Sequence, residues 1–299
     1  MQHYKSVAVI IVNWNNRWAT SCCIRSLQRM VYTNYFIIVV DNGSTDGSID
    51  YLTRQYPDIA MIEMKRNTGF GKGANAGIRH ALDHNADFLW ILNNDTQVTP
   101  NSLLALVLSM ERDTDAGMAG SVLIESTNGH RTRVGGGRVN FITGIPSNRT
   151  GKNTADKLDF IKGASILLRS QAIDIKGGAC FDESYFLYWE DTDLGFRLRA
   201  RGWKLIVVPD SIVIHDGYGS MTHESPGWDY YFTRSSLIFF LAHARLPLLP
   251  ICVSVIGRMT LRLMRGQWSN ATALLKALFV PGSGPFPPGA PDTSKGSLQ

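Results

Sequence analysis

The chain has 299 residues, of which 44% are hydrophobic and 18% are charged, and its formal net charge is +5. This length and composition suit a folded protein with a substantial core, and they exclude a disordered or fibrous chain. Four cysteines without regular spacing match neither a disulfide framework nor a zinc ribbon, so we expect a reducing, cytoplasmic setting.

The first hundred residues alternate short apolar runs with helix-compatible stretches. The short polar start and the brief apolar run after it predict neither a signal peptide nor a spanning helix there. The expected strands are Val7–Val12, Phe36–Val40, Ala60–Met64 and Phe88–Leu92, and the expected helices are Trp18–Met30, Ser48–Gln55 and Ala74–His84. This β-α-β-α order predicts a parallel sheet covered by helices.

The rest of the chain is less regular. The expected elements are a helix over Leu103–Met110, a long loop or loosely paired hairpin over Gly129–Asn153, a strand over Ala164–Leu168, a helix over Asp191–Arg201, and strands over Leu205–Val208 and Ile212–Ile214. The apolar segment Leu237–Ile256 follows, interrupted by His243, Arg245, Pro247 and Pro250. Those interruptions argue against a membrane span.

Polar residues follow the expected strands, at Asn13, Asp41, Asn67 and Asn93 to Asp95. Ligands of parallel α/β sheets collect at the carboxyl ends of the strands. A carboxylate such as Asp41 can accept hydrogen bonds from a nucleotide base or a ribose hydroxyl. Asp46, five residues later, is better explained as shaping the turn and capping the next helix.

A glycine-rich stretch runs from Arg66 to Gly77 and matches part of the dinucleotide fingerprint. The match is weak, because the acidic residue Asp41 precedes the glycines instead of following them. Such a turn at a helix start can still cradle a pyrophosphate through backbone N–H groups, with Lys72 nearby for charge. The alternative is a loop whose glycines only permit a sharp turn.

The triplet Asn93-Asn94-Asp95 ends an apolar strand. Its oxygen atoms suit a hard divalent cation that also binds a diphosphate, although Asn and Asp are also common turn residues. His215 follows a later strand and is placed to complete a cation site with Asp95. The alternative for a lone histidine is an ordinary hydrogen-bonded group.

The segment Phe181–Arg197 embeds five acidic residues among aromatic ones. Charges in such surroundings are costly unless they are paired or functional. Asp191, in the first turn of the expected helix, is favoured in the ionised form that a general base requires. Asp193 and Arg197 are spaced as a structural ion pair, and Glu190 has two interpretations, contact with an acceptor or capping of the helix.

Taken in order, these motifs resemble family 2 of the inverting glycosyltransferases, which have the GT-A fold, and within it the bacterial rhamnosyltransferase-like and galactofuranosyltransferase-like members. The resemblance runs from about Val7 to Arg234. It implies an α/β fold with one nucleotide-sugar-binding domain over residues 1–230, whose central, mainly parallel sheet is flanked by helices. A basic and apolar helical extension over residues 231–280 and a flexible Gly/Pro/Ser tail over 281–299 are expected to follow.

The resemblance also implies roles for individual residues. Asp191, the last acid of a W-E-D motif, is the expected catalytic base, and Asp95 and His215 are the expected ligands of Mg²⁺ or Mn²⁺. Contacts with the acceptor are expected from Gly163, Trp189 and Glu190. Contacts with the nucleotide sugar are expected from Val12, Asn13, Asn15, Asp41, Asn67, Gly69, Phe70, Lys72, Asn75, Asn93 and Asn94. One departure is that Asn93 stands where the family has Asp, which lowers the negative charge of the cation site.

The function that follows from the resemblance is transfer of a sugar, with rhamnose as the expected one, from a dTDP- or UDP-sugar. The expected acceptor is a hydroxyl of a glycan or lipid-linked glycan in cell-surface polysaccharide synthesis. One alternative is a sugar nucleotidyltransferase, which normally carries a glycine-rich loop where this chain has Asn13 to Asn16. Another is a non-catalytic sugar- or membrane-binding scaffold, for which Asn93 is the only support.

The basic excess is C-terminal, since six positive and no acidic residues occur from Tyr230 to Ala290. The apolar content of this segment suits an anionic membrane better than a nucleic acid. Three arginines at helical spacing, Arg258, Arg262 and Arg265, lie beside Leu261, Met264 and Trp268 and predict a basic amphipathic face. We therefore expect a cytoplasmic protein that is peripheral on the inner face of the membrane; the alternative is a helix packed on the catalytic domain.

Overall fold

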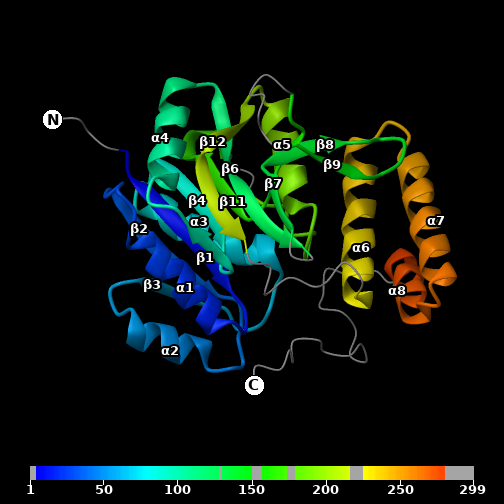
Figure 1. Cartoon of the computed structure of the whole chain (residues 1–299), viewed down its shortest axis with the longest axis horizontal. Helices are drawn as coiled ribbons and strands as arrows, with labels where there is room; N and C mark the ends of the chain where they lie inside the picture. The colour runs from blue at the N-terminus through cyan, green and yellow to red at the C-terminus, as the bar shows by residue number, and fades with distance from the viewer. Residues whose placement is uncertain (1–4, 128–129, 150–156, 174–178, 216–224, 280–299) are drawn as a thin grey trace.

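A computed structural model of the chain describes residues 5–127, 130–149, 157–173, 179–215 and 225–279. The expected tail over 281–299 and the ends of the expected loop over Gly129–Asn153 lie outside the described residues. A large sheet with helices on both faces forms the body, and three C-terminal helices pack along one side of it (Figure 1). The fold is α/β, as predicted.

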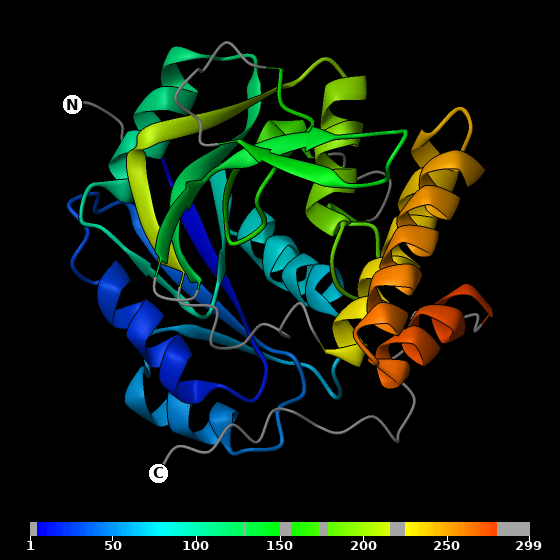
Figure 2. The same ribbon diagram turned by 45° about the vertical axis from the view of Figure 1, so that its right-hand side comes forward.

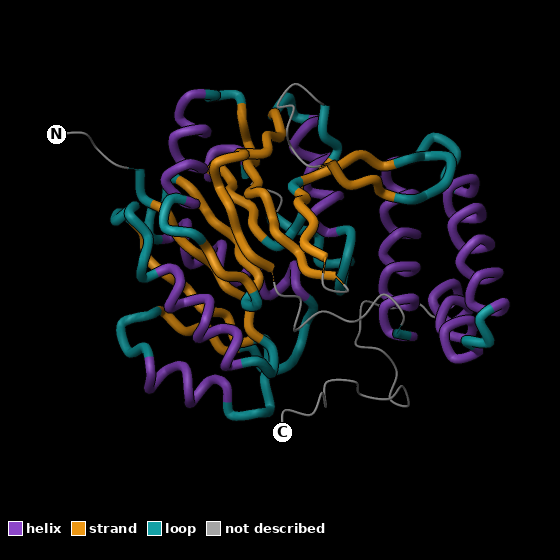
Figure 3. Tube along the Cα trace, viewed as in Figure 1, coloured by secondary structure: helices purple, strands orange, loops and turns teal. Residues whose placement is uncertain are grey.

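The sheet, whose strands are orange in Figure 3, has the strand order β3-β2-β1-β4-β11-β6-β12-β5, and β7 pairs with β6. Strands β1 to β4 are parallel, as predicted, whereas β5, β7 and β11 run antiparallel to their neighbours. The strands are β1 (Val7–Asn13), β2 (Tyr35–Asp41), β3 (Ala60–Glu63), β4 (Phe88–Asn93), β5 (Thr96–Val98), β6 (Ala116–Thr127), β7 (His130–Val134), β11 (Ser165–Arg169) and β12 (Lys204–His215).

Helices cover both faces of this sheet. The apolar residues of α1, α2 and α4 form one core layer with the sheet, and those of α3 and α5 form the other. The helices are α1 (Arg17–Leu27), α2 (Ser48–Gln55), α3 (Phe70–Asp83), α4 (Ser102–Arg112) and α5 (Glu190–Ala200), with a short 3-10 helix over Ser170–Ala172. Strands β1 and β4 are buried on both sides because they lie between the two layers.

Helix α3 begins four residues before its expected start, so the glycine-rich stretch is the first part of a helix. Its glycines let the helix approach the sheet closely. A Cβ at Gly73 would lie 3.0 Å from Val12 Cγ1, and one at Gly77 would lie 2.5 Å from Ile10 Cγ2. Close packing therefore explains these glycines, whereas only Gly69, with φ of +89°, serves as the turn that the sequence predicts.

The second half of the sheet departs from expectation in two ways. The expected strands around Pro209 and Asp210 are one strand, β12, with an irregularity between Val208 and Ile212. The expected loop or hairpin contains β7 and a paired hairpin, β8 (Gly136–Val139) with β9 (Pro146–Arg149), which joins β10 (Phe160–Ile161) in a small second sheet. The hairpin interpretation is thus the correct one for its described residues.

Three helices follow the sheet: α6 (Pro226–His243), α7 (Leu248–Met264) and α8 (Trp268–Phe279). None of the helices in the described part of the chain combines the length and apolar character needed to cross a bilayer. The expected basic face is wrong in its orientation. Arg258 and Arg262 turn inward, toward the fully buried Asp229 of α6, and Arg262 Nε lies 2.9 Å from Asp229 Oδ2.

Candidate functional site

Polar residues at the ends of β1, β2 and β4 lie side by side at the carboxyl edge of the sheet, as predicted. The strand register places Asn13 beside Asp41 and Val12 beside Asn93. Asn13 Nδ2 donates to Asp41 Oδ1 at 2.7 Å, and Asn94 Nδ2 donates to Asn13 Oδ1 at 3.4 Å. Residues far apart in the sequence therefore share one hydrogen-bonded network at the carboxyl edge of the sheet.

Asp41 is buried and bonded within the protein. Besides Asn13, it accepts a hydrogen bond from the backbone N–H of Ser44 at 2.9 Å. Asn15, with φ of +51°, accepts one from the backbone N–H of Thr45 at 2.7 Å. These contacts fix the shape of the turn after β2, and recognition of a base by Asp41 and Asn15 stays a prediction.

The loop before α3 is held by Asn42, a buried residue that the sequence analysis does not single out. Asn42 Nδ2 donates to Asn67 Oδ1 at 3.2 Å and to the Gly69 carbonyl at 3.0 Å. The backbone N–H of Phe70 donates to the Phe186 carbonyl at 2.9 Å, and a side chain at Gly69 would collide with that carbonyl. The expected nucleotide loop is thus fastened to the acidic and aromatic segment.

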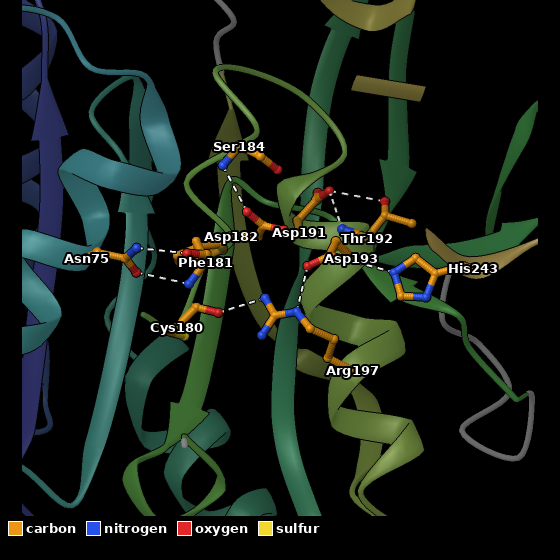
Figure 4. Close-up of polar contacts among 10 residues, drawn as sticks. All are labelled: Asn75, Cys180, Phe181, Asp182, Ser184, Asp191, Thr192, Asp193, Arg197 and His243. Carbon is orange, nitrogen blue, oxygen red and sulfur yellow. Dashed lines mark hydrogen bonds and ion pairs between the residues drawn. The ribbon is translucent and has the colours of Figure 1, made fainter. Parts of the chain in front are cut away.

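Lys72 and Asn75 make a second connection between α3 and that segment. Lys72 Nζ lies 3.0 Å from Glu183 Oε2. Asn75 donates to the Phe181 carbonyl at 2.8 Å and accepts from the Phe181 N–H at 2.9 Å, as Figure 4 shows. Asn75 is buried and its amide bonds the backbone of Phe181, so it holds the segment in place, and its expected contact with the nucleotide sugar stays a prediction.

Asp191 lies in the first turn of α5, against Gly163. Its Oδ1 accepts the backbone N–H of Thr192 at 2.6 Å (Figure 4), and a Cβ at Gly163 would lie 3.0 Å from Asp191 Oδ2. Burial raises the pKa of Asp191, while hydrogen bonds from Thr192 and from the Gly163 backbone oppose that rise. A carboxyl group with a raised pKa at a helix start is suited to accept a proton.

The two residues before Asp191 differ in their surroundings. Burial and the neighbouring Asp191 raise the pKa of Glu190 to about 8. Trp189, with φ of +69°, is buried against Phe239 and Phe240 of α6, with ring centroids 4.8 and 5.3 Å away. The expected direct contact of Trp189 with an acceptor does not match this placement, because the indole forms part of an aromatic core.

Asp193 forms the predicted ion pair with Arg197, at 2.6 Å between Oδ2 and Nε. Its other oxygen lies 2.8 Å from His243 Nε2 of α6, and Arg197 also donates to the Cys180 carbonyl at 2.7 Å (Figure 4). Asp193 therefore fastens the helix that carries Asp191 to α6, and its partner Arg197 fastens the same helix to the preceding segment.

Asp95 and His215 are brought together as predicted, and the structure adds two residues. His215 Nε2 lies 3.3 Å from Asp95 Oδ1, His215 Nδ1 lies 3.1 Å from Glu125 Oε1, and Lys162 Nζ lies 2.9 Å from Glu125 Oε2. The register explains this row, since His215 of β12 pairs with Glu125 of β6 on one side and with Thr96 of β5 on the other. Glu125 follows the apolar run 122–124, which is the signal that could have identified it.

Charges in this row stabilise one another. Burial alone would raise the pKa of Glu125, but His215 and Lys162 lower it to about 2. Burial alone would lower the pKa of His215, but Asp95 and Glu125 raise it to about 9. In the absence of a cation, the row is therefore an alternation of negative and positive groups.

The three consecutive residues 162–164 connect the row around His215 with Asp191 and with Asn93 at the end of β4. Lys162 pairs with Glu125 of the His215 row, and Gly163 contacts Asp191. The carbonyl of Ala164 accepts the backbone N–H of Asn93 at 3.1 Å. The metal candidates and the base candidate are thus linked through three consecutive residues.

Comparisons with known proteins identify the family of the chain. Residues 8–175 match the sequence profile of the family described as "Glycosyl transferase family 2". The chain is 29% identical over 231 residues to the "N-acetylglucosaminyl-diphospho-decaprenol L-rhamnosyltransferase" of Mycobacterium tuberculosis, covering 69% of this chain and 74% of that one. It is 24% identical over 182 residues to the "dTDP-rhamnosyl transferase RfbF" of Shigella flexneri, covering 61% and 60%.

Solved structures share the fold at lower identity. The structure of Staphylococcus aureus TarS 1–349 aligns with a TM-score of 0.59 and 15% identity over 92% of this chain and 81% of that one. The mannosyltransferase PcManGT from Pyrobaculum calidifontis, solved with GDP-Man and Mn²⁺, aligns with a TM-score of 0.58 and 15% identity over 94% and 77%. At these identities the likeness concerns the fold alone.

Proposed function

This chain belongs to glycosyl transferase family 2 and is a glycosyltransferase with the GT-A fold, and from that premise we propose that it transfers rhamnose from a nucleoside-diphosphate donor to an acceptor hydroxyl. The observation that supports the proposal best is the junction at residues 162–164, which connects Asp191 with Asn93 and with the Asp95–His215 row. The donor diphosphate and the acceptor hydroxyl must be held next to each other for the reaction, and residues 162–164 link the side chains proposed to bind each of them.

We assign the role of base to Asp191. As the acceptor oxygen attacks the anomeric carbon, its proton passes to the Asp191 carboxylate, the bond from that carbon to the diphosphate oxygen breaks, and the nucleoside diphosphate departs. The configuration of the anomeric carbon inverts in this single displacement. Glu190 and Gly163, which flank the base, are the proposed acceptor contacts.

The residues around His215 fit a divalent cation, Mg²⁺ or Mn²⁺. The buried His215 Nε2 has no aligned hydrogen-bond partner within the described ranges, and it lies beside an Asp95 oxygen. The described residues include no group of three or more His, Cys, Asp or Glu side chains that could hold a metal ion by themselves. Asp95 and His215 would hold the cation together with donor phosphate oxygens, and the bound cation would supply positive charge to the leaving diphosphate.

Glu125 is the proposed orienting partner of His215. Because Glu125 accepts from Nδ1, it directs Nε2 toward Asp95. Glu125→Ala is expected to weaken Mn²⁺ binding by about 10- to 100-fold, measured with the donor diphosphate by electron paramagnetic resonance. Glu125→Gln, whose amide oxygen can still accept from Nδ1, should restore part of the affinity, and Glu111→Gln on the exposed face of α4 is the control. Unchanged Mn²⁺ affinity in Glu125→Ala would remove Glu125 from the site.

The proposed donor is dTDP-rhamnose, with other dTDP- and UDP-sugars as the next candidates. The support is that two relatives are described as rhamnosyltransferases. A calorimetric binding screen across dTDP-, UDP- and GDP-sugars, each with Mn²⁺, is expected to show the tightest binding for dTDP-rhamnose. Preferred binding of a GDP-sugar would contradict the proposal. Donor hydrolysis in the same samples also separates a transferase from a nucleotidyltransferase, which breaks a different phosphate bond, and from a non-catalytic scaffold.

The proposed acceptor is a glycan or lipid-linked glycan used in polysaccharide synthesis at the cytoplasmic side of a membrane. The M. tuberculosis relative supports the lipid-linked kind, since its name describes an acceptor on decaprenol diphosphate. Such an acceptor would keep the enzyme at the membrane surface while its sugar enters the site beside Asp191.

A further inference from the structure

Helix α7 exposes a stripe of large apolar side chains. Leu249, Val253, Ile256 and Leu263 recur at helical spacing and are all exposed, with Ile256 at 63%. In a helix that faces water these positions normally carry polar residues. The outward stripe is therefore unsuited to water and suited to an apolar environment.

The inward face of α7 carries polar and charged residues beside the buried Pro250 and Ile251. Ser254, Arg258 and Arg262 point toward α6, where Arg262 Nε lies 2.9 Å from the buried Asp229. Asn270 of α8 donates to the same Asp229 oxygen atom, Oδ2, at 2.7 Å. This buried charge cluster fixes the rotation of α7, because turning the apolar stripe inward would leave Asp229 buried without its cations.

The apolar surface continues onto neighbouring elements. Most of the large hydrophobic side chains that are exposed in the described residues lie after residue 240. In Figures 1 and 2, α7 and α8 form the outermost layer on one side of the molecule, beyond α6. Besides the stripe, the exposed large apolar residues of α7, α8 and the connection before α7 are Leu246, Leu248, Leu261, Met264, Trp268, Leu275 and Phe279.

The exposed charged residues of these helices are positive, which favours an anionic partner. Arg245, Arg265 and Lys276 are exposed on the same helices and their connections, and residues 230–291 include no acidic residue. A contact between two copies through this face would bring like charges together in a two-fold arrangement. An anionic lipid surface instead satisfies both the apolar side chains and the cations.

We propose that the outer face of α7 and α8 docks on an anionic phospholipid bilayer, with the apolar stripe in the interface and the basic residues at the headgroups. The docking deepens the proposed function and rests on it for its purpose, because it would hold the transferase beside a lipid-linked acceptor. The binding itself rests on two observations, the exposed apolar stripe of α7 and the positive charge of the exposed residues near it.

Flotation of the full chain with vesicles tests the proposal. We expect the protein to float with phosphatidylcholine vesicles that contain about 30 mol% phosphatidylglycerol, and to float less without the anionic lipid or in high salt. The double variant Ile256→Glu/Leu263→Glu should reduce the floated fraction at least tenfold. Val31→Glu, an exposed apolar position before β2, is the matched control and should float like the unmodified protein.

Three outcomes are decisive. Absence of binding to the anionic vesicles at low salt would overturn the proposal. A dimer in solution that the double variant dissociates, without vesicle binding, would assign the face to a second copy and also overturn it. Transfer to a water-soluble acceptor analogue should be unchanged in the double variant. Failure of that transfer in the unmodified protein, with vesicle binding intact, would contradict the proposed function alone.

Discussion

Replacing Asp191 by Asn is expected to lower the rate of sugar transfer by about 100- to 10,000-fold, the range associated with loss of a general base. The amide can still accept the backbone N–H of Thr192 through its oxygen, so the start of α5 should remain folded. It cannot take the proton of an acceptor hydroxyl. The measurement is the initial rate of nucleoside diphosphate release with acceptor present, together with the dissociation constant of the donor, which should be nearly unchanged.

The control for this experiment is Asp182→Asn, an exposed acid in the same segment whose side chain accepts from the Ser184 N–H. Burial raises the pKa of Asp191, so the rate of the unmodified enzyme should rise with pH as this group loses its proton. That rise should disappear from whatever rate the variant retains. More than a few per cent of the original rate in Asp191→Asn would exclude it as the base.

Removal of the cation, or of Asp95, is the second change expected to have a large effect. Chelation with EDTA should lower transfer by about 100-fold or more, since a catalytic cation contributes several kcal/mol to stabilising developing charge. Added Mn²⁺ should restore it. Asp95→Ala should have a similar effect that added Mn²⁺ does not reverse, because one of the two proposed protein ligands is lost.

Two measurements keep this prediction specific. Binding of Mn²⁺ in the presence of donor diphosphate should weaken in Asp95→Ala, and the thermal midpoint shows whether the variant is folded. Asp58→Asn, an exposed acid before β3, should behave like the unmodified enzyme in both. Full activity in excess chelator would show that Asn93, in place of the family's Asp, belongs to a site that works without a cation.

The first part of the sheet, β1 to β4, is predicted well from the sequence because the patterns that indicate it are local in the chain. Each of the first strands is a continuous apolar run, and each ends in polar residues such as Asn13 or Asp41 at the sheet edge. The ion pair of Asp193 with Arg197 is equally local, since both lie on one helix face. Residues whose neighbours are near in sequence can be interpreted from spacing alone.

Distant partners were predicted where strand ends signal them, as for Asp95 and His215, but others were missed or misplaced. Glu125 and Lys162 meet because β11 inserts between β4 and β6. This insertion places residues 162–164 beside both the row around His215 and Asp191. The arginines of α7 have the helical spacing that was predicted, but the buried acid that draws two of them inward, Asp229, precedes them by about thirty residues. Spacing gives the period of a helix and does not say which of its faces is outside.

The insertion of β11 between β4 and β6 has a consequence for biosynthesis. Once the ribosome has made β4, the strands and helices of the first 93 residues can pack, but one edge of β4 has no partner until residues 165–169 emerge. At about 5–20 residues per second this interval lasts roughly 4–15 s. Open strand edges pair with strands of other chains. We therefore expect the yield of folded protein to depend more on chaperone capture during this interval than on the stability of the finished fold.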